Sequence, residues 1–412
     1  MPPARKRPRD RKAQIARAAS DAFSTSGFHA VSMEQIATRV GVSAAALYRH
    51  ATSKYDLFRD AVLSLSQQLV DATEFADASV DTEPAQLRDA VLTALIDTSL
   101  TNRAFSGPFR WEGRHLLDAD RAALTNQVKL VHRRLQRPLM QLRPDLTAAQ
   151  RWTLSSAALS VIGSIADHHA KLGTRQIRSL LLTLSVEALD AQLPVDPPSI
   201  PARREPEVEV EVDRGMTYEA LLQGSVELFH QNGYHGTTIH DIAAVVGVPV
   251  SGIYRYFTGK ADILAAAFRR AADRVSADLS EALAASPDPA VVLDRLVDAY
   301  IARSFDNPEL AYLYYTDKGN LPSAEAKVLH NIQRATVERW AELVTAARDG
   351  VDLAEARFIV HATFTLVVDL GRLADYDNSP ENRELVGTLM RTILFGAEAL
   401  RGRAAPLDGL SA

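Results

Sequence analysis

The chain contains no cysteine, and several other features of its composition exclude whole classes of protein. Without cysteine there can be no disulfide, no zinc–thiolate centre and no cysteine nucleophile. No apolar run approaches the roughly 20 residues that a membrane span requires. The Pro- and Arg-rich N-terminus also lacks the apolar core of a secretory signal. These absences predict a cytoplasmic protein that makes no contact with a membrane.

Recognisable catalytic and metal-binding motifs are also missing from the sequence. We find no phosphate-binding glycine loop, no His-Glu-x-x-His and no Gly-x-Ser-x-Gly element. His168 and His169 are adjacent, next to Asp167, on a segment expected to be helical. Adjacent side chains on a helix point in different directions, which favours hydrogen-bonded or solvated histidines over a metal site. The sequence therefore predicts a protein that is not an enzyme and needs no cofactor or metal.

What the sequence does contain is an internal repeat. Shifted by 206 residues, residues 15–62 align with residues 221–268 without a gap, and 412 is twice that offset. A weaker match at an offset of 205 pairs residues 112–135 with residues 317–340. Each half is thus expected to hold a small N-terminal domain and a larger body of about 130 residues, an ordinary domain size.

The periodicity is helical throughout, and turn residues mark the boundaries. Apolar residues recur every four positions from Leu57 to Leu69, and no sustained strand pattern appears, so the fold is predicted to be all-α. Prolines near residue 197 rule out a continuous helix between the halves. Alternating Glu and Val at 205–212 could form a short strand, but like charges on one face favour an extended linker. The expected segments are a basic arm (1–12), a helix-turn-helix domain (13–63), a body (64–193), a linker (194–213), a second helix-turn-helix domain (214–269), a second body (270–403) and a tail (404–412).

The repeated segment has the features of a helix-turn-helix. In the second copy, residues 237–238 suit a helix cap, Gly247 breaks that helix, and Pro249 suits the start of a second one over 250–257. In the first copy, Ser32 and Ser43 are the expected caps and the recognition helix is expected over 44–50. A short braced helix of this kind can enter a DNA major groove.

Charge is distributed unequally between the two copies. The net charge of the chain is -5, yet residues 5–60 carry eleven basic and five acidic side chains. The second copy carries three basic and four acidic side chains over residues 214–262. Because attraction to phosphates dominates non-specific binding to DNA, the first copy is expected to contribute more affinity. The basic arm is expected to follow the DNA backbone or enter a minor groove, with a disordered solubilising tail as the alternative.

These motifs resemble the N-terminal domain of TetR-family transcriptional regulators. The resemblance rests on sets such as Gly41-Val42-Ser43 with Leu47-Tyr48-Arg49-His50, and Gly247-Val248 with Ile253-Tyr254-Arg255-Tyr256-Phe257. It implies an all-α regulator, usually dimeric and often a repressor, whose helical body binds an inducer. Two such units in one chain imply an intramolecular pseudo-dimer on a double-stranded DNA operator. Whether two chains associate further stays open.

The residues expected to bind DNA come from the arm and both copies. They are Arg5, Lys6, Arg7, Ser32, Ser43, Ala44, Ala45, Tyr48, Arg49, His50, Lys54, Thr238, Val250, Ser251, Tyr254, Arg255, Tyr256 and Lys260. The alanine methyl groups suit contact with thymine methyls, whereas the Tyr, His and Lys side chains suit phosphates.

The bodies offer a second group of candidates, for an unidentified small-molecule effector. They are Trp111, Arg114, His115, Tyr312, Tyr315 and Trp340. Aromatic stripes in helical proteins more often form core than ligand sites, so a core role is the alternative for these residues. The sequence thus predicts a ligand-responsive DNA-binding repressor with two reading heads. The alternative is a single-head DNA binder whose second unit is a structural or protein-interaction module.

Overall fold

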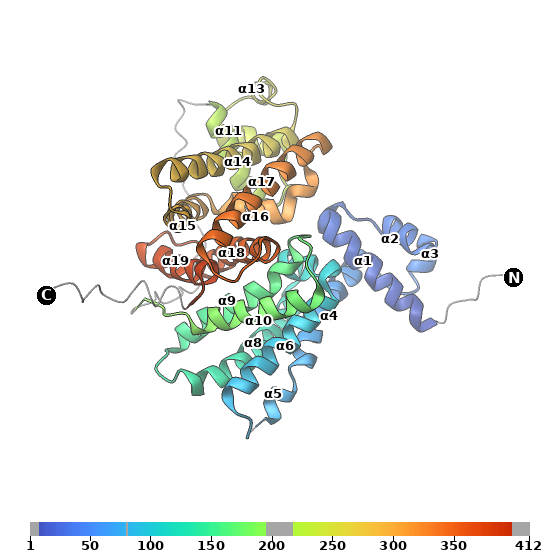
Figure 1. Ribbon diagram of the computed structural model, residues 1–412. Coiled ribbons are helices and arrows are strands. Elements are labelled where there is room, and N and C mark those ends of the chain that lie inside the picture. Colours follow the sequence, from blue (N-terminus) through green and yellow to red (C-terminus); the bar gives the residue numbers. More distant parts are fainter. Residues whose placement is uncertain (1–7, 80, 195–216, 398–412) are drawn as a thin grey trace.

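The computed structural model describes residues 8–79, 81–194 and 217–397, which form helices and their connections with no strand (Figure 1). This agrees with the predicted all-α class. Arg5, Lys6 and Arg7 of the basic arm, most of the linker and the C-terminal tail lie outside the described residues. Among the described helices, none combines the length and apolarity needed to cross a membrane.

The two halves repeat one order of helices. In the first half the head is formed by α1 (Pro8–Ala30), α2 (Met33–Val40) and α3 (Ala44–Leu47). A long helix, α4 (Lys54–Ala72), joins this head to its body. The body contains α5 (Phe75–Ala78), α6 (Pro84–Thr101), η1 (Arg103–Phe105), α7 (Gly107–Trp111), η2 (Gly113–His115), α8 (Asp118–Leu142), α9 (Ala148–Gly163), η3 (Ser164–Ala166) and α10 (Thr174–Asp190).

The second half follows the same plan. Its head is formed by α11 (Thr217–Asn232), α12 (Ile239–Val246) and α13 (Val250–Ile253), and α14 (Lys260–Ala285) leads into the body. The body contains α15 (Pro289–Asp306), α16 (Pro308–Asp317), η4 (Lys318–Asn320), α17 (Ser323–Ala347), α18 (Leu353–Leu373) and α19 (Pro380–Phe395).

Three larger apolar cores hold these helices together. Each head has a core of its own, centred on Phe23 and Phe58 in the first and on Phe229 and Phe268 in the second. The two bodies instead share one continuous core that runs from residue 76 to residue 395. The bodies of the two halves are therefore a single packing unit.

The shared core forms where α9 and α10 pack against α18 and α19, near the middle of Figure 1. Helix α18 is buried on nearly every side, as expected of an apolar helix at the centre of a bundle. Helix α9 presents small residues to it, with Ala157 and Ala158 fully buried. Small side chains let the two helices approach closely, so the alanines of α9 favour a close contact between the halves.

Polar side chains also cross this contact. Arg110 of the first half donates from Nε to Asp167 at 2.8 Å and from Nη2 to Asp369 of the second half at 2.6 Å. Asp369 also accepts from Ser160 at 2.5 Å. Burial alone would lower the pKa of Arg110, but the two carboxylates hold that pKa above its ordinary value. A second ion pair joins Arg348 to Glu187 across the halves, at 2.7 Å.

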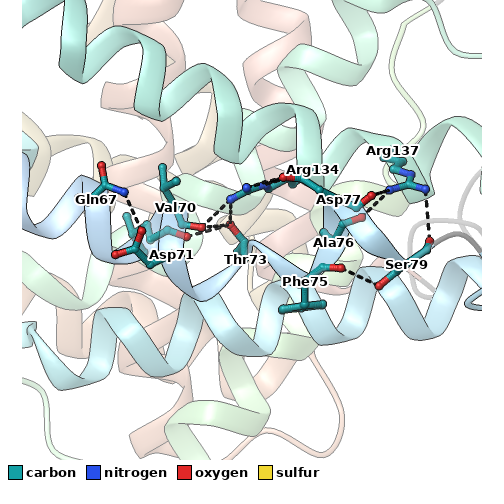
Figure 2. Close-up of polar contacts among 11 residues, drawn as sticks. Gln67, Val70, Asp71, Thr73, Phe75, Ala76, Asp77, Ser79, Arg134 and Arg137 are labelled. Carbon is teal, nitrogen blue, oxygen red and sulfur yellow. Dashed lines mark hydrogen bonds and ion pairs between the residues drawn. The ribbon is translucent and has the colours of Figure 1, made fainter.

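The end of the first body farthest from its head is held by two arginines of α8 (Figure 2). Buried Arg134 donates to Asp77 and, from Nη1, to the carbonyl of Val70 at 2.5 Å and the hydroxyl of Thr73 at 3.1 Å. Arg137 donates to the carbonyls of residues 76 and 79. These bonds reach carbonyls at the end of α4, in α5 and just after it, where a helix leaves its last carbonyls without the usual partner four residues on.

Two expectations about local structure need correction. His168 and His169 are not on a helix, because α9 ends at Gly163 and the 3₁₀ turn after it ends at residue 166. The recognition helices are also shorter than expected, covering only residues 44–47 and 250–253 before the chain continues in turns.

We predict that Gly163→Ala destabilises the contact between the halves. A β-carbon at residue 163 would lie 2.3 Å from Nη1 of Arg110, whose guanidinium is fixed by two carboxylates. We expect a cost of about 1–3 kcal/mol, as for other over-packed sites, measured by chemical denaturation. Gly252→Ala is the control, because its β-carbon would meet only ordinary contacts at 3.7 Å. Equal effects of the two substitutions would contradict this account.

Candidate nucleic-acid interface and effector cavities

The first head contains a helix-turn-helix whose turns are fixed by local hydrogen bonds. The Ser32 hydroxyl accepts from the amide of Gln35, whose side chain accepts in return from the amide of Ser32. Gly41 ends α2 in the left-handed region, with φ of 72°, which favours glycine. Ser43 then caps α3 by accepting from the amide of Ala46 at 3.2 Å.

The second head uses the same design with one difference. Thr238 and Asp241 form the reciprocal cap of α12, and Gly247 ends that helix with φ of 71°. Pro249 precedes α13 and has no side chain that can cap it. Phe257 is buried and stacks on Tyr218, whereas the matching Ala51 is only half-buried. The second recognition segment is therefore anchored by an aromatic contact rather than by a cap.

The residues that follow each recognition helix are exposed. Tyr48 is 53% exposed and Tyr254 is 57% exposed, more than any other phenylalanine, tyrosine or tryptophan side chain that the structure describes. Arg49, His50, Arg255 and Tyr256 are exposed beside them, as are Ala45 and Ser251. Ala44 and Val250 are half-buried. Each head thus presents an aromatic and basic surface of the kind that can contact DNA.

Other predicted DNA-binding residues have roles within the fold. Ser32, Ser43 and Thr238 cap helices, as described above. The Lys54 ammonium donates to the carbonyl of Phe28 at 3.0 Å, and Lys260 donates to the carbonyl of Tyr234 at 2.6 Å. Each lysine also lies 4.4 Å from the centre of the neighbouring aromatic ring. Both lysines therefore fasten the end of the first head helix to the start of the helix that leads into the body.

The two heads meet next to the contact between the bodies. His29 and His235 occupy the same position in the repeat, and their ring centres are 6.2 Å apart. His115 packs edge-on against His29 at 4.7 Å, and its Nε2 lies 3.2 Å from Glu112. Burial and then the neighbouring histidines lower the pKa of His29. The lowered pKa favours the neutral form of the His29 imidazole where the two heads meet.

The predicted effector residues are mostly found at the contact between the halves. Trp111 stacks on Tyr315 with 4.4 Å between ring centres, and the Tyr312 hydroxyl donates to the carbonyl of Trp111 at 3.3 Å. The Arg114 guanidinium lies over the ring of Tyr312. Trp340 is buried in the shared core against Phe364. Of the predicted set, Tyr315 also lines one of the cavities described next.

Each body contains a cavity. The first cavity has a volume of about 240 Å³ and lies between α4, α6, α8 and α9, lined by residues such as Ser66, Ser99, Gln127 and His132. Asp369 of the second half also lines it. The second cavity has a volume of about 210 Å³ and lies between α14, α15, α16, α17 and α18. Apart from Tyr315, the residues that line these cavities were not predicted from the sequence. The pattern that could have indicated them is the small residues on the inner faces of α4 and α14, such as Ser66 and Ala272.

Two helix-turn-helix heads on an all-helical body define the class of DNA-binding regulators. Comparison with known proteins agrees, because the profile of bacterial regulatory proteins of the tetR family matches residues 15–61 and 221–267. The chain therefore carries the N-terminal domain of the TetR family twice.

Individual relatives are similar over part of their length. The transcriptional activator FasR of Mycolicibacterium smegmatis is 38% identical over 85 residues, or 20% of this chain and 39% of the relative. The fatty acid metabolism regulator of Bacillus subtilis is 32% identical over 82 residues, or 19% of this chain and 42% of the relative. The chain thus spans about two fifths of each curated relative. The solved fatty acid degradation regulator FadR of Bacillus halodurans is 20% identical, with a TM-score of 0.37, and covers 44% of this chain and 95% of its own.

We predict that Lys54→Met destabilises the first head without changing the salt dependence of DNA binding. The substitution removes charged hydrogen bonds to backbone carbonyls, at a cost of about 1–2 kcal/mol. Thermal unfolding and the slope of log K against log salt would measure the two effects. Exposed Arg49→Gln is the matched control and should reduce the slope by about one, with little change in stability. A reduced slope with unchanged stability for Lys54→Met would assign that lysine to phosphate binding instead.

We also predict that acid weakens the fold through buried histidines. Burial lowers the pKa of His361 to about 4 from 6.5, so the unfolded chain binds a proton there that the folded chain does not. This contribution to stability is complete above pH 6.5 and is lost as the pH falls towards 4. His361→Gln should flatten the dependence of unfolding free energy on pH in this range by about 1.4 kcal/mol per pH unit. Exposed His330→Gln should leave it unchanged, and equal slopes for both variants would contradict the assignment.

Proposed function

We propose that this protein is a ligand-responsive transcriptional repressor whose two heads read the two halves of a pseudo-palindromic operator. One observation carries the proposal: two well-formed helix-turn-helix heads, each with an exposed Tyr-Arg pair after its recognition helix, stand on bodies that share one core. A subunit with one head needs a partner to contact two half-sites, whereas here both heads belong to one molecule. The bundle of α9, α10, α18 and α19 then serves as a dimer interface within a single chain.

The operator in this proposal has unlike half-sites. Where the first recognition segment exposes Ala45 and His50, the second exposes Ser251 and Tyr256. Alanine can contact a thymine methyl, whereas serine can donate or accept a hydrogen bond at a base edge. The centres of the half-sites are expected about 34 Å apart, one helical turn of DNA.

The first helices of the two heads, α1 and α11, differ in charge. This difference supports unequal contributions of the two heads to the affinity for DNA. Helix α1 carries Arg11, Lys12 and Arg17, whereas α11 contains no lysine or arginine. Phosphate contacts add affinity without sequence information, so the first head should supply more of the salt-sensitive attraction. The same asymmetry favours the alternative, in which only the first head reads DNA and the second is a structural or protein-interaction module.

In this proposal the effector binds in the cavities of the bodies. Helices α4 and α14 each form part of a cavity wall and continue directly from a head. The tilt of α4 and α14 sets the distance between the two heads. A ligand that binds more tightly at one tilt would shift the population towards the corresponding distance between the heads. Release from the operator follows if the favoured spacing no longer matches successive major grooves. No step in this scheme requires catalysis.

The test compares Tyr48→Ala with Tyr254→Ala, each in the full chain, on an operator selected from random DNA. Loss of a hydrogen bond to a phosphate should weaken binding about tenfold or more at each head that reads DNA. Comparable losses support two reading heads, whereas loss only with Tyr48→Ala supports the single-head alternative. Tyr218→Phe, which keeps the stacking on Phe257, is the control. Failure of the intact chain to bind any selected sequence would reject both functions.

A further inference from the structure

The two cavities are the same site in two copies of the repeat. At an offset of 206, Ser66 and Leu69 of the first cavity match Ala272 and Val275 of the second. At an offset of 205, Ser99 matches Ser304. A difference in lining between the two cavities is therefore a difference between duplicated copies of one pocket.

The second cavity is lined mainly by aromatic and aliphatic side chains. Five aromatic rings contribute to its wall, and all of its lining residues come from the second half of the chain. The rings are Phe268, Tyr300, Tyr314, Tyr315 and Phe364. The hydroxyl of Tyr314 is already bound to the side chain of Gln333. Most of the wall is therefore suited to contact the apolar part of a ligand.

Positive charge is found at the edge of the second cavity. Arg274 lines the cavity and also a wider surface hollow that contains Arg269 and Arg270. Arg269 and Arg270 pair with Glu325 and Glu219, whereas Arg274 forms no ion pair with any residue that the structure describes. An apolar cavity beside an unpaired guanidinium matches a molecule with an apolar body and an anionic head group.

The first cavity differs from the second in its polar groups. At the position of Arg274 the first half has Gln68. The wall of the first cavity is largely aliphatic, with one phenylalanine, Phe109, and its uncharged polar groups are serine, glutamine and histidine side chains. His132 lines it, and burial lowers the pKa of this imidazole to about 4, so it is neutral at pH 7. Its Nδ1 lies 2.9 Å from the Ser155 hydroxyl. This wall offers uncharged hydrogen-bonding groups.

The charges in the first cavity disfavour an anion. Arg110 lines the wall, but its guanidinium is bound by two carboxylates, Asp167 and Asp369. Because both carboxylates bind this guanidinium, it offers no free positive charge to an anionic ligand. Asp369 itself faces the cavity, and a second carboxylate brought close to it in a partly dry site would be repelled. Because Asp369 comes from α18, the first cavity is complete only when the second half is in place.

We propose that the two cavities bind chemically different effectors. The second cavity takes an amphipathic organic anion, and the first takes an uncharged ligand that combines an apolar body with hydrogen-bonding groups. This inference rests on the proposed function as a ligand-responsive regulator and extends it to a regulator with two unlike inputs. Each cavity adjoins the contact between the halves: Arg110 lines the first cavity and Tyr315 lines the second, and both residues take part in that contact.

The test uses two probes of equal chain length, octanoate and 1,2-octanediol, with the full chain. Ser99→Leu and Ser304→Leu fill the matching positions of the first and second cavities. By calorimetric titration, Ser304→Leu should abolish octanoate binding and leave octanediol binding unchanged, and Ser99→Leu should do the reverse. Arg274→Gln, which installs the residue of the first half, should weaken octanoate binding about tenfold. Exposed Arg295→Gln is the charge-matched control and should have no effect.

Several outcomes would overturn the inference. One is competition between octanoate and octanediol for a single site. Another is that both leucine variants lose binding of the same probe. The third is that octanoate shows no saturable binding to the unaltered chain. Unfolding curves of each variant would show whether a loss reflects misfolding. Operator binding without probes is measured in parallel: retained DNA binding with a failed probe pattern rejects only the two effector classes. The expected probe pattern without DNA binding rejects the proposed function instead.

Discussion

The packing of α9 against α18 is the constraint on which the rest of the molecule depends. It joins two bodies into one core, so neither half can move as an independent domain without exposing apolar surface. Removing such surface from water is the main favourable term in folding. The heads have separate cores, and each of these cores also includes residues of the adjoining body, such as Leu116 in the first half and Leu313 in the second. The extensive apolar contact between the halves therefore lies in the bodies rather than in the heads.

The contact is not symmetric, although it was formed by a repeat. Arg110 of the first half has Tyr315 as its counterpart in the second, and Asp369 has Gly163. The absence of a side chain at Gly163 leaves room for the Arg110 guanidinium. Two copies of the first half would lack Asp369, and two copies of the second would bury that carboxylate without Arg110. A buried charge without its partner is strongly destabilising. The halves are thus complementary to each other rather than to themselves.

Sequence reasoning reached the fold class, the repeat and the family, because these follow from local patterns. Helical periodicity, caps such as Ser32 and Thr238, and glycines that end helices act over a few residues. The roles of Lys54 and of Trp111 depend instead on residues distant in the chain: Phe28 for the first, and Asp167 with Tyr315 for the second. The cavities were missed for the same reason. A cavity is defined by what five helices leave unfilled, and no spacing along one helix reports it.

Under the proposed function, the position of the cavities would link effector binding to the contact between the halves. Arg110 lines the first cavity and binds Asp369, while Tyr315 lines the second cavity and stacks on Trp111. The indole of Trp111 in turn donates to Asp167, the other carboxylate bound by Arg110. A ligand in either cavity therefore meets one connected set of side chains at the centre of the molecule. Because close-packed interiors transmit small displacements, this set can couple both cavities to the angle between α4 and α14, and so to the spacing of the heads.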